Sequence, residues 1–170
     1  MQIQLNTSIM RLEDMPLDIG YASEKVTLTS KEGEKHVIGG QSGLTQLIIT
    51  APFIDDTFVA ELEAIEKSLP AGDASLTASI IVAGENHNDP KLGRFRFLID
   101  SDSEFSDWYG VRLSGDPLDG ELTKALFVIS KDGALYYDEF AKNLYDPFNA
   151  ETALRKIHAA QECYTGKGCH

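Results

Sequence analysis

Cysteine is nearly absent from this 170-residue chain. Its only two, Cys163 and Cys169, both lie within the last eight residues. A disulfide framework of the kind that holds small secreted domains together needs several cysteines spread along the chain. That class of protein is therefore excluded. An apolar core must hold the fold together instead, and a hydrophobic fraction of 42% in a chain of this length is sufficient to build one.

Basic residues are also scarce. The chain has 15 lysines and arginines against 27 acidic residues, which gives a net charge of −12. Such a charge repels phosphate backbones, so we expect no nucleic-acid partner. No apolar run approaches the roughly 20 residues that span a bilayer. Because no charged segment followed by an apolar one opens the chain, we expect a cytoplasmic protein without a membrane partner. Glycine-rich phosphate-binding motifs are missing, and we expect no cofactor.

The order of the predicted elements indicates an α/β fold. Alternating or β-branched stretches predict strands, and apolar residues repeating every three or four positions predict helices. One helix is expected to be capped by Asp55 or Asp56 and to end at Pro70, and the last is expected to be capped by Asn149 and to end near Tyr164. The predicted strands cover residues 2–5, 8–12, 25–29, 36–38, 44–50, 75–83, 94–99, 125–130 and 134–140.

This order, β-α-β followed by β-β-α, is typical of the thioredoxin fold. We expect a mixed central sheet flanked by helices, with a β-hairpin at the N-terminus. Residues 1–164 are predicted to form a single domain, and residues 165–170 a C-terminal tail. No internal repeat, linker or low-complexity segment divides the chain.

Three stretches of sequence resemble one known family. WYGVRLSGDPLDGELTKALFVISKDG (108–133) is similar to a pattern YGVxxxxGxLxGxxxRxxFVxDxxG, and ALYYDEFAKNLYDPFNAETAL (134–154) is similar to the strand and helix that follow it. TAPFIDDTFVAEL (50–62) lies where the family has PSxDTxVC. The family is that of the atypical two-cysteine thiol peroxidases, a branch of the peroxiredoxins within the AhpC/TSA-like redoxin superfamily. The resemblance implies a thioredoxin fold and a homodimer.

In that family, a cysteine in the first turn of a helix is held as thiolate by the helix dipole, an arginine and a threonine hydroxyl. The thiolate attacks the peroxide O–O bond and becomes a sulfenic acid. A resolving cysteine then condenses with it to a disulfide, which thioredoxin reduces. Carried onto this chain, the threonine is Thr57, the nucleophile position is Ala60 and the arginine position is Lys124. The region of the resolving cysteine, residues 84–93, contains no cysteine.

The absence of both cysteines favours a thiol-peroxidase-like protein that has lost peroxidase activity. It would then act by binding or in another non-peroxidatic role. One alternative is a thiol–disulfide redox protein that uses Cys163 and Cys169. Another is a family peroxidase, reducing hydroperoxides with thioredoxin, whose nucleophile has been replaced by mutation. Because CxxxxxC is not an established redox signature, the first interpretation is preferred.

Three further groups of residues are candidates for chemistry. His158, Cys163, Cys169 and His170 are residue types that bind Zn²⁺, but their spacing matches no known zinc motif, so we expect no metal site. His87, with Glu85 and Asp89 nearby, could supply ligands or an acid–base pair, although we expect this loop to be solvated. Trp108, beside Tyr109, is expected to pack in the core.

Overall fold

The computed structural model describes residues 1–71 and 75–162, and it is built on a seven-stranded mixed sheet. The strand order is β10-β9-β5-β6-β7-β3-β4, and a second, three-stranded sheet has the order β1-β2-β8. The strands are β1 (Gln2–Leu5), β2 (Ser8–Leu12), β3 (Val26–Ser30), β4 (Lys35–Ile38), β5 (Thr45–Thr50), β6 (Leu76–Val82), β7 (Phe95–Ile99), β8 (Leu113–Ser114), β9 (Ala125–Ile129) and β10 (Leu135–Phe140). The helices are α1 (Asp56–Ser68), α2 (Glu104–Tyr109) and α3 (Ala150–Gln161).

Strand β5 lies in the interior of the large sheet, between β9 and β6, and all six of its residues are buried. It pairs in parallel with β6 and antiparallel with β9. Its sequence does not alternate between apolar and polar residues, as is typical of a strand that is covered on both faces. The antiparallel pairing places Thr50, the last residue of β5, opposite Ala125, the first of β9. The end of β5 and the residues just before β9 therefore meet at one edge of the sheet.

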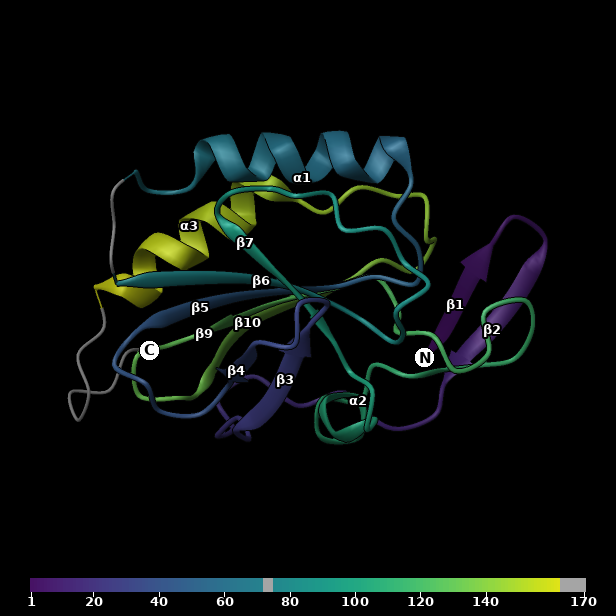
Figure 1. The fold of residues 1–170 in the computed structure, drawn as a ribbon, viewed down its shortest axis with the longest axis horizontal. Coiled ribbons are helices and arrows are strands. Elements are labelled where there is room, and N and C mark those ends of the chain that lie inside the picture. The colour runs from purple at the N-terminus through teal and green to yellow at the C-terminus, as the bar shows by residue number, and fades with distance from the viewer. Residues whose placement is uncertain (72–74, 163–170) are drawn as a thin grey trace.

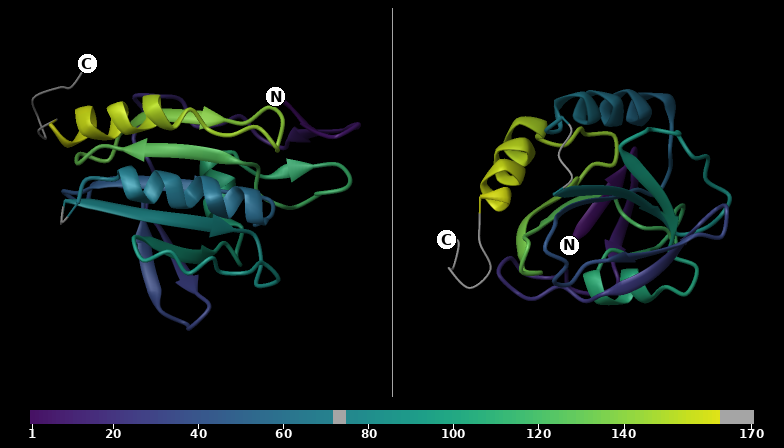
Figure 2. Two further views of the ribbon diagram at one scale, coloured as in Figure 1. Left: turned by 90° about the horizontal axis from the view of Figure 1, so that it is seen from above. Right: turned by 60° about the vertical axis from the view of Figure 1, so that its left-hand side comes forward.

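The two long helices cover one face of this sheet, and α2 lies on the other face (Figure 1). Figure 2 shows the β1–β2 hairpin at the opposite end of the molecule from the end of α3. Apolar residues of α1 and α3 pack with β5, β6 and β9 in one core cluster. The short α2 contributes Phe105 and Tyr109 to a second cluster on the other face. None of the helices in the described ranges is long and apolar enough to cross a bilayer.

The expected α/β thioredoxin-type arrangement with an N-terminal hairpin is confirmed. Asp55 and Asn149 are the N-caps of α1 and α3, as their positions indicated. Helix α3 ends at Gln161, earlier than the end expected near Tyr164, which lies outside the described residues. The two-residue strand β8 was not predicted, because two residues show no periodicity.

The expectation that Trp108 packs in the core is wrong. Its exposed fraction is 53%, whereas Tyr109 is fully buried. Tyr109 stacks on Phe105, one helical turn earlier, with ring centroids 4.1 Å apart. Adjacent residues on a helix point about 100° apart, so burying Phe105 and Tyr109 together turns Trp108 outward.

Candidate functional site

The first turn of α1 lies at the edge of the sheet where β5 ends. Asp55 caps the helix, and its Oδ1 accepts a hydrogen bond from the Phe58 N–H at 2.8 Å. Asp56 adds a second carboxylate to the same turn. The positive end of a helix dipole attracts anions, which is how the resembled family stabilises its thiolate. In this chain, two aspartates already surround that end.

Lys124 is held beside α1 by the pairing of β5 with β9. It directly precedes Ala125, and the Thr50 hydroxyl donates a hydrogen bond of 2.7 Å to the carbonyl of Thr123. The Lys124 side chain is only 5% exposed. A lysine so deeply buried needs compensating partners, because removing an ammonium group from water is costly.

The Lys124 ammonium group has two hydrogen-bond acceptors and two aromatic rings as partners. Lys124 Nζ donates to Glu61 Oε1 at 2.7 Å and to the Asp146 carbonyl at 2.6 Å. The same Nζ lies 4.8 Å from the ring centroid of Phe58 and 4.9 Å from that of Phe148, within the range of cation–π attraction. The charge of Lys124 is therefore engaged by protein groups on several sides.

Glu61 connects this cation to the segment that leads into α3. Its Oε1 accepts from Lys124, and its Oε2 accepts from the Phe148 N–H at 2.6 Å. Phe58 and Phe148 also meet edge to face, with ring centroids 6.4 Å apart. What remains is a hollow of about 20 Å³. That volume holds about one water molecule.

The structure brings two of the three predicted site residues together. Thr57 and Lys124 both line the hollow, together with Phe58 and Glu61. Ala60, the position carried over from the family nucleophile, is exposed on α1 and is not among the residues that line it. The side chain on α1 that lies over the cation is Phe58.

The sequence reasoning missed Phe58 and Glu61. Glu61 follows Thr57 by four residues, a spacing that places both on one face of a helix. That signal was available, but several residues of this helix are acidic, and nothing local marks Glu61 as the one that pairs with a buried cation. Its partner Lys124 is 63 positions away in the chain.

His87 lies in the loop that replaces the region of the resolving cysteine. Its Nε2 is 2.8 Å from Glu121 Oε2, and its side chain is only 10% exposed. The expectation of a simply solvated loop is therefore wrong for His87. It pairs with a distant carboxylate rather than with Glu85 or Asp89. This contact ties the loop to the segment that leads to Lys124.

Only one of the four candidate metal or redox residues near the C-terminus lies in the part of the chain that the structure describes. Cys163, Cys169 and His170 lie outside the described residues, and His158 is exposed on α3. Within residues 1–71 and 75–162, no group of three or more histidine or acidic side chains is placed to hold a metal ion.

Comparison with solved structures identifies the fold. The structure is similar to the crystal structure of a peroxiredoxin-like protein from Aquifex aeolicus, with a TM-score of 0.83 and 19% identity; the match covers 94% of this chain and 96% of the other. The fold is thus the peroxiredoxin form of the thioredoxin fold. No protein-family model matches the chain.

Comparison with curated proteins confirms the resemblance to the thiol peroxidases. The chain is 29% identical to the thiol peroxidase of Campylobacter jejuni, over 95% of this chain and 94% of the relative. It is 20% identical to that of Aquifex aeolicus, over 91% of this chain and 95% of the relative. The similarity extends over almost the whole chain.

Introducing a thiol at two positions of α1 tests whether Lys124 can still stabilise a thiolate. In the variant Thr57→Cys, the thiol is in the first turn and lines the hollow with Lys124; in Ala60→Cys, it lies beyond that turn and does not line the hollow. Proximity to a helix N-terminus and an available cation lowers a thiol pKa. Because Glu61 already compensates Lys124, and Asp55 and Asp56 lie at the start of the same helix, we expect the two thiols to be alkylated at similar rates at pH 7, measured by iodoacetamide labelling and intact mass in a background with Cys163 and Cys169 changed to serine. Alkylation of the Thr57→Cys thiol several-fold faster than that of Ala60→Cys would show that the cation is still available to an anion.

Proposed function

We propose that this protein has lost peroxide reduction at the site shared with the thiol peroxidases and that it acts by binding. The observation that carries the proposal is the contact network of Lys124. Where peroxide chemistry needs a free cation beside a thiolate, Lys124 is paired with Glu61 and covered by Phe58 and Phe148. The carried-over nucleophile position holds alanine, which has no electron pair to attack an O–O bond.

Electrostatics support the same proposal. Lys124 could stabilise a neighbouring thiolate only if its positive charge were not already compensated by Glu61. Asp55, Asp56 and Glu61 place three carboxylates around the start of α1, against the single cation. Such surroundings disfavour a further anion rather than stabilise it.

A coupled assay tests the proposal. The chain is incubated with hydrogen peroxide or an organic hydroperoxide, thioredoxin, thioredoxin reductase and NADPH, and the oxidation of NADPH is followed. We expect no turnover above the rate without the chain. Turnover at a rate typical of enzymes, about 1–10³ s⁻¹, would overturn the proposal.

The assay also separates the second candidate, a redox protein that uses the tail cysteines. In that case, one thiolate attacks the peroxide to give a sulfenic acid and water or an alcohol, and the second thiol condenses with it to a disulfide with loss of water. Turnover that disappears in Cys163→Ser would indicate this route. With either function, we propose a homodimer, as the resemblance implies, and a cytoplasmic location.

A further inference from the structure

Exposed apolar side chains are concentrated around one depression that is separate from the hollow at Lys124. Eight large hydrophobic residues in the described ranges are exposed, and four of them line this depression: Met1, Met15, Ile19 and Tyr21. Met15 is 88% exposed. Single exposed apolar residues are common on protein surfaces, whereas their grouping at one depression makes it a candidate interaction site.

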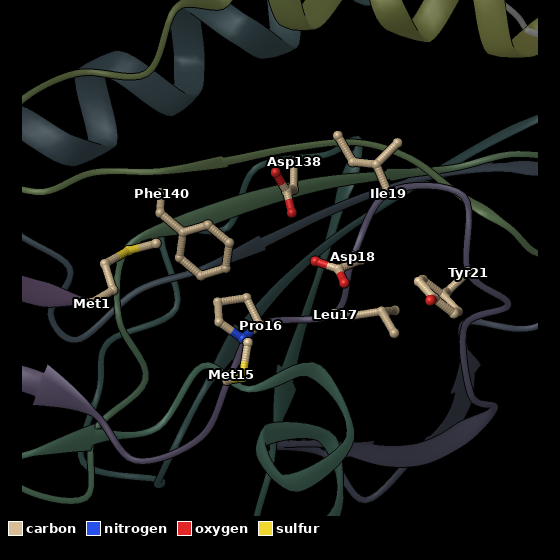
Figure 3. A pocket seen from close by; sticks show the side chains of 9 residues that line it. All are labelled: Met1, Met15, Pro16, Leu17, Asp18, Ile19, Tyr21, Asp138 and Phe140. Carbon is tan, nitrogen blue, oxygen red and sulfur yellow. The ribbon is translucent and has the colours of Figure 1, made fainter.

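The depression is formed where residues 15–21 run alongside β10. Gly20 N–H donates to the Leu135 carbonyl at 2.7 Å, and Leu135 N–H donates to the Tyr21 carbonyl at 2.9 Å. The opposite wall comes from Asp138 and Phe140 of β10 (Figure 3). The depression is open to solvent, and its volume of about 650 Å³ is far larger than that of the hollow at Lys124.

Two carboxylates face this apolar space. Asp18 and Asp138 both line it, and Figure 3 shows them directed toward its middle. Within the described part of the chain, neither side chain makes a hydrogen bond or an ion pair. Partial burial and, next, the negative charge of Asp18 raise the pKa of Asp138. The site thus holds uncompensated negative charge among apolar groups, and a cation placed between the two carboxylates would relieve it.

We propose that this depression binds a basic, apolar-flanked peptide segment of a partner protein. A lysine or arginine would lie between Asp18 and Asp138, and its apolar neighbours would contact Met15, Ile19 and Tyr21. Methionine side chains adapt to irregular apolar surfaces and are used in peptide recognition. The net charge of −12 also favours a basic partner over an acidic one.

A second copy of the chain is a poorer occupant. Pairing this patch with itself across a twofold axis brings the carboxylates of both copies together, which costs energy in like-charge repulsion. The inference adds a partner to the proposed binding function. It can be tested without peroxide, so that its failure and the failure of the proposed function are separate results.

The three methionines provide the experiment. Met1 and Met15 line the depression, whereas Met10 is buried in the cluster around the β1–β2 hairpin and serves as an internal reference. The full chain is labelled with ¹³C at the methionine methyl groups and titrated with an acetylated, amidated hexapeptide in which leucine alternates with lysine. We expect saturable shifts of the Met1 and Met15 signals and no shift of Met10.

Matched peptides and one double variant separate the apolar contribution to binding from the contribution of the two carboxylates. Replacing the leucines by serine, or the lysines by glutamine, is expected to weaken binding. Asp18→Asn with Asp138→Asn is expected to weaken binding of the lysine peptide by about tenfold and to leave the glutamine peptide unaffected. An unchanged Met10 signal and melting temperature would show that the variant is folded.

Three results would overturn the proposal. The first is no shift of Met1 or Met15 at millimolar peptide. The second is equal binding of the lysine and glutamine peptides, which would show apolar adhesion without charge recognition. The third is a concentration-dependent shift of Met1 and Met15 without peptide, which would show that a second copy occupies the site.

Discussion

Replacing Glu61 by alanine is expected to lower the free energy of unfolding by about 3–5 kcal/mol. Glu61 is the carboxylate that compensates Lys124, whose side chain is only 5% exposed. Its removal leaves a buried cation with only a carbonyl and two aromatic rings as partners. It also leaves the Phe148 N–H without its acceptor. Urea denaturation followed by circular dichroism measures the loss.

Three further variants show which part of this loss is electrostatic. Glu61→Gln keeps an acceptor for Phe148 but removes the charge, and we expect an intermediate loss. Glu63→Ala removes an exposed carboxylate from the same helix and is expected to change stability by less than about 0.5 kcal/mol. Replacing the pair together, Glu61→Leu with Lys124→Met, is expected to recover most of the loss, because no charge is then left buried. A loss in Glu61→Ala no greater than that in Glu63→Ala would contradict the assigned role of the ion pair.

The regular elements were largely predictable from local patterns. The run Leu44–Thr50 indicated the central strand, and the alternation near the N-terminus indicated the hairpin. Caps at Asp55 and Asn149 were predictable because a short polar side chain before an apolar periodic stretch satisfies free amides of the first turn. Strand β8 and the direction of Trp108 depend on contacts with distant segments, which no local pattern records.

The candidate site was only partly predictable. The resemblance placed Thr57 and Lys124 in the site, and the structure brings them together at one hollow. It did not reveal that Phe58 lies over the cation or that Glu61 neutralises it, because these contacts join segments more than 60 positions apart. The depression lined by Met15 and Asp138 is likewise formed by segments far apart in the chain, and neither carries a recognisable motif.

Peroxide reactivity should differ by orders of magnitude between this chain and an active thiol peroxidase. The family reaction requires a thiolate with a lowered pKa beside an available cation. This chain has no cysteine before residue 163, and Glu61 holds Lys124 in a hollow with room for about one water molecule. Any thiol reaction with peroxide must then come from Cys163 and Cys169.

The measurement that tests this loss of chemistry most directly is a single turnover without any reductant, because it does not depend on recognition by a chosen thioredoxin. The prereduced chain is mixed with one equivalent of hydrogen peroxide, and the remaining peroxide is followed from the first second, beside the Campylobacter jejuni thiol peroxidase as control. We expect no rapid phase in this chain, and only slow loss that disappears when both cysteines are changed to serine. Rapid consumption of one equivalent that requires neither added reductant nor a second protein would contradict the proposed loss of peroxide chemistry, and its disappearance in the double serine variant would assign it to Cys163 and Cys169.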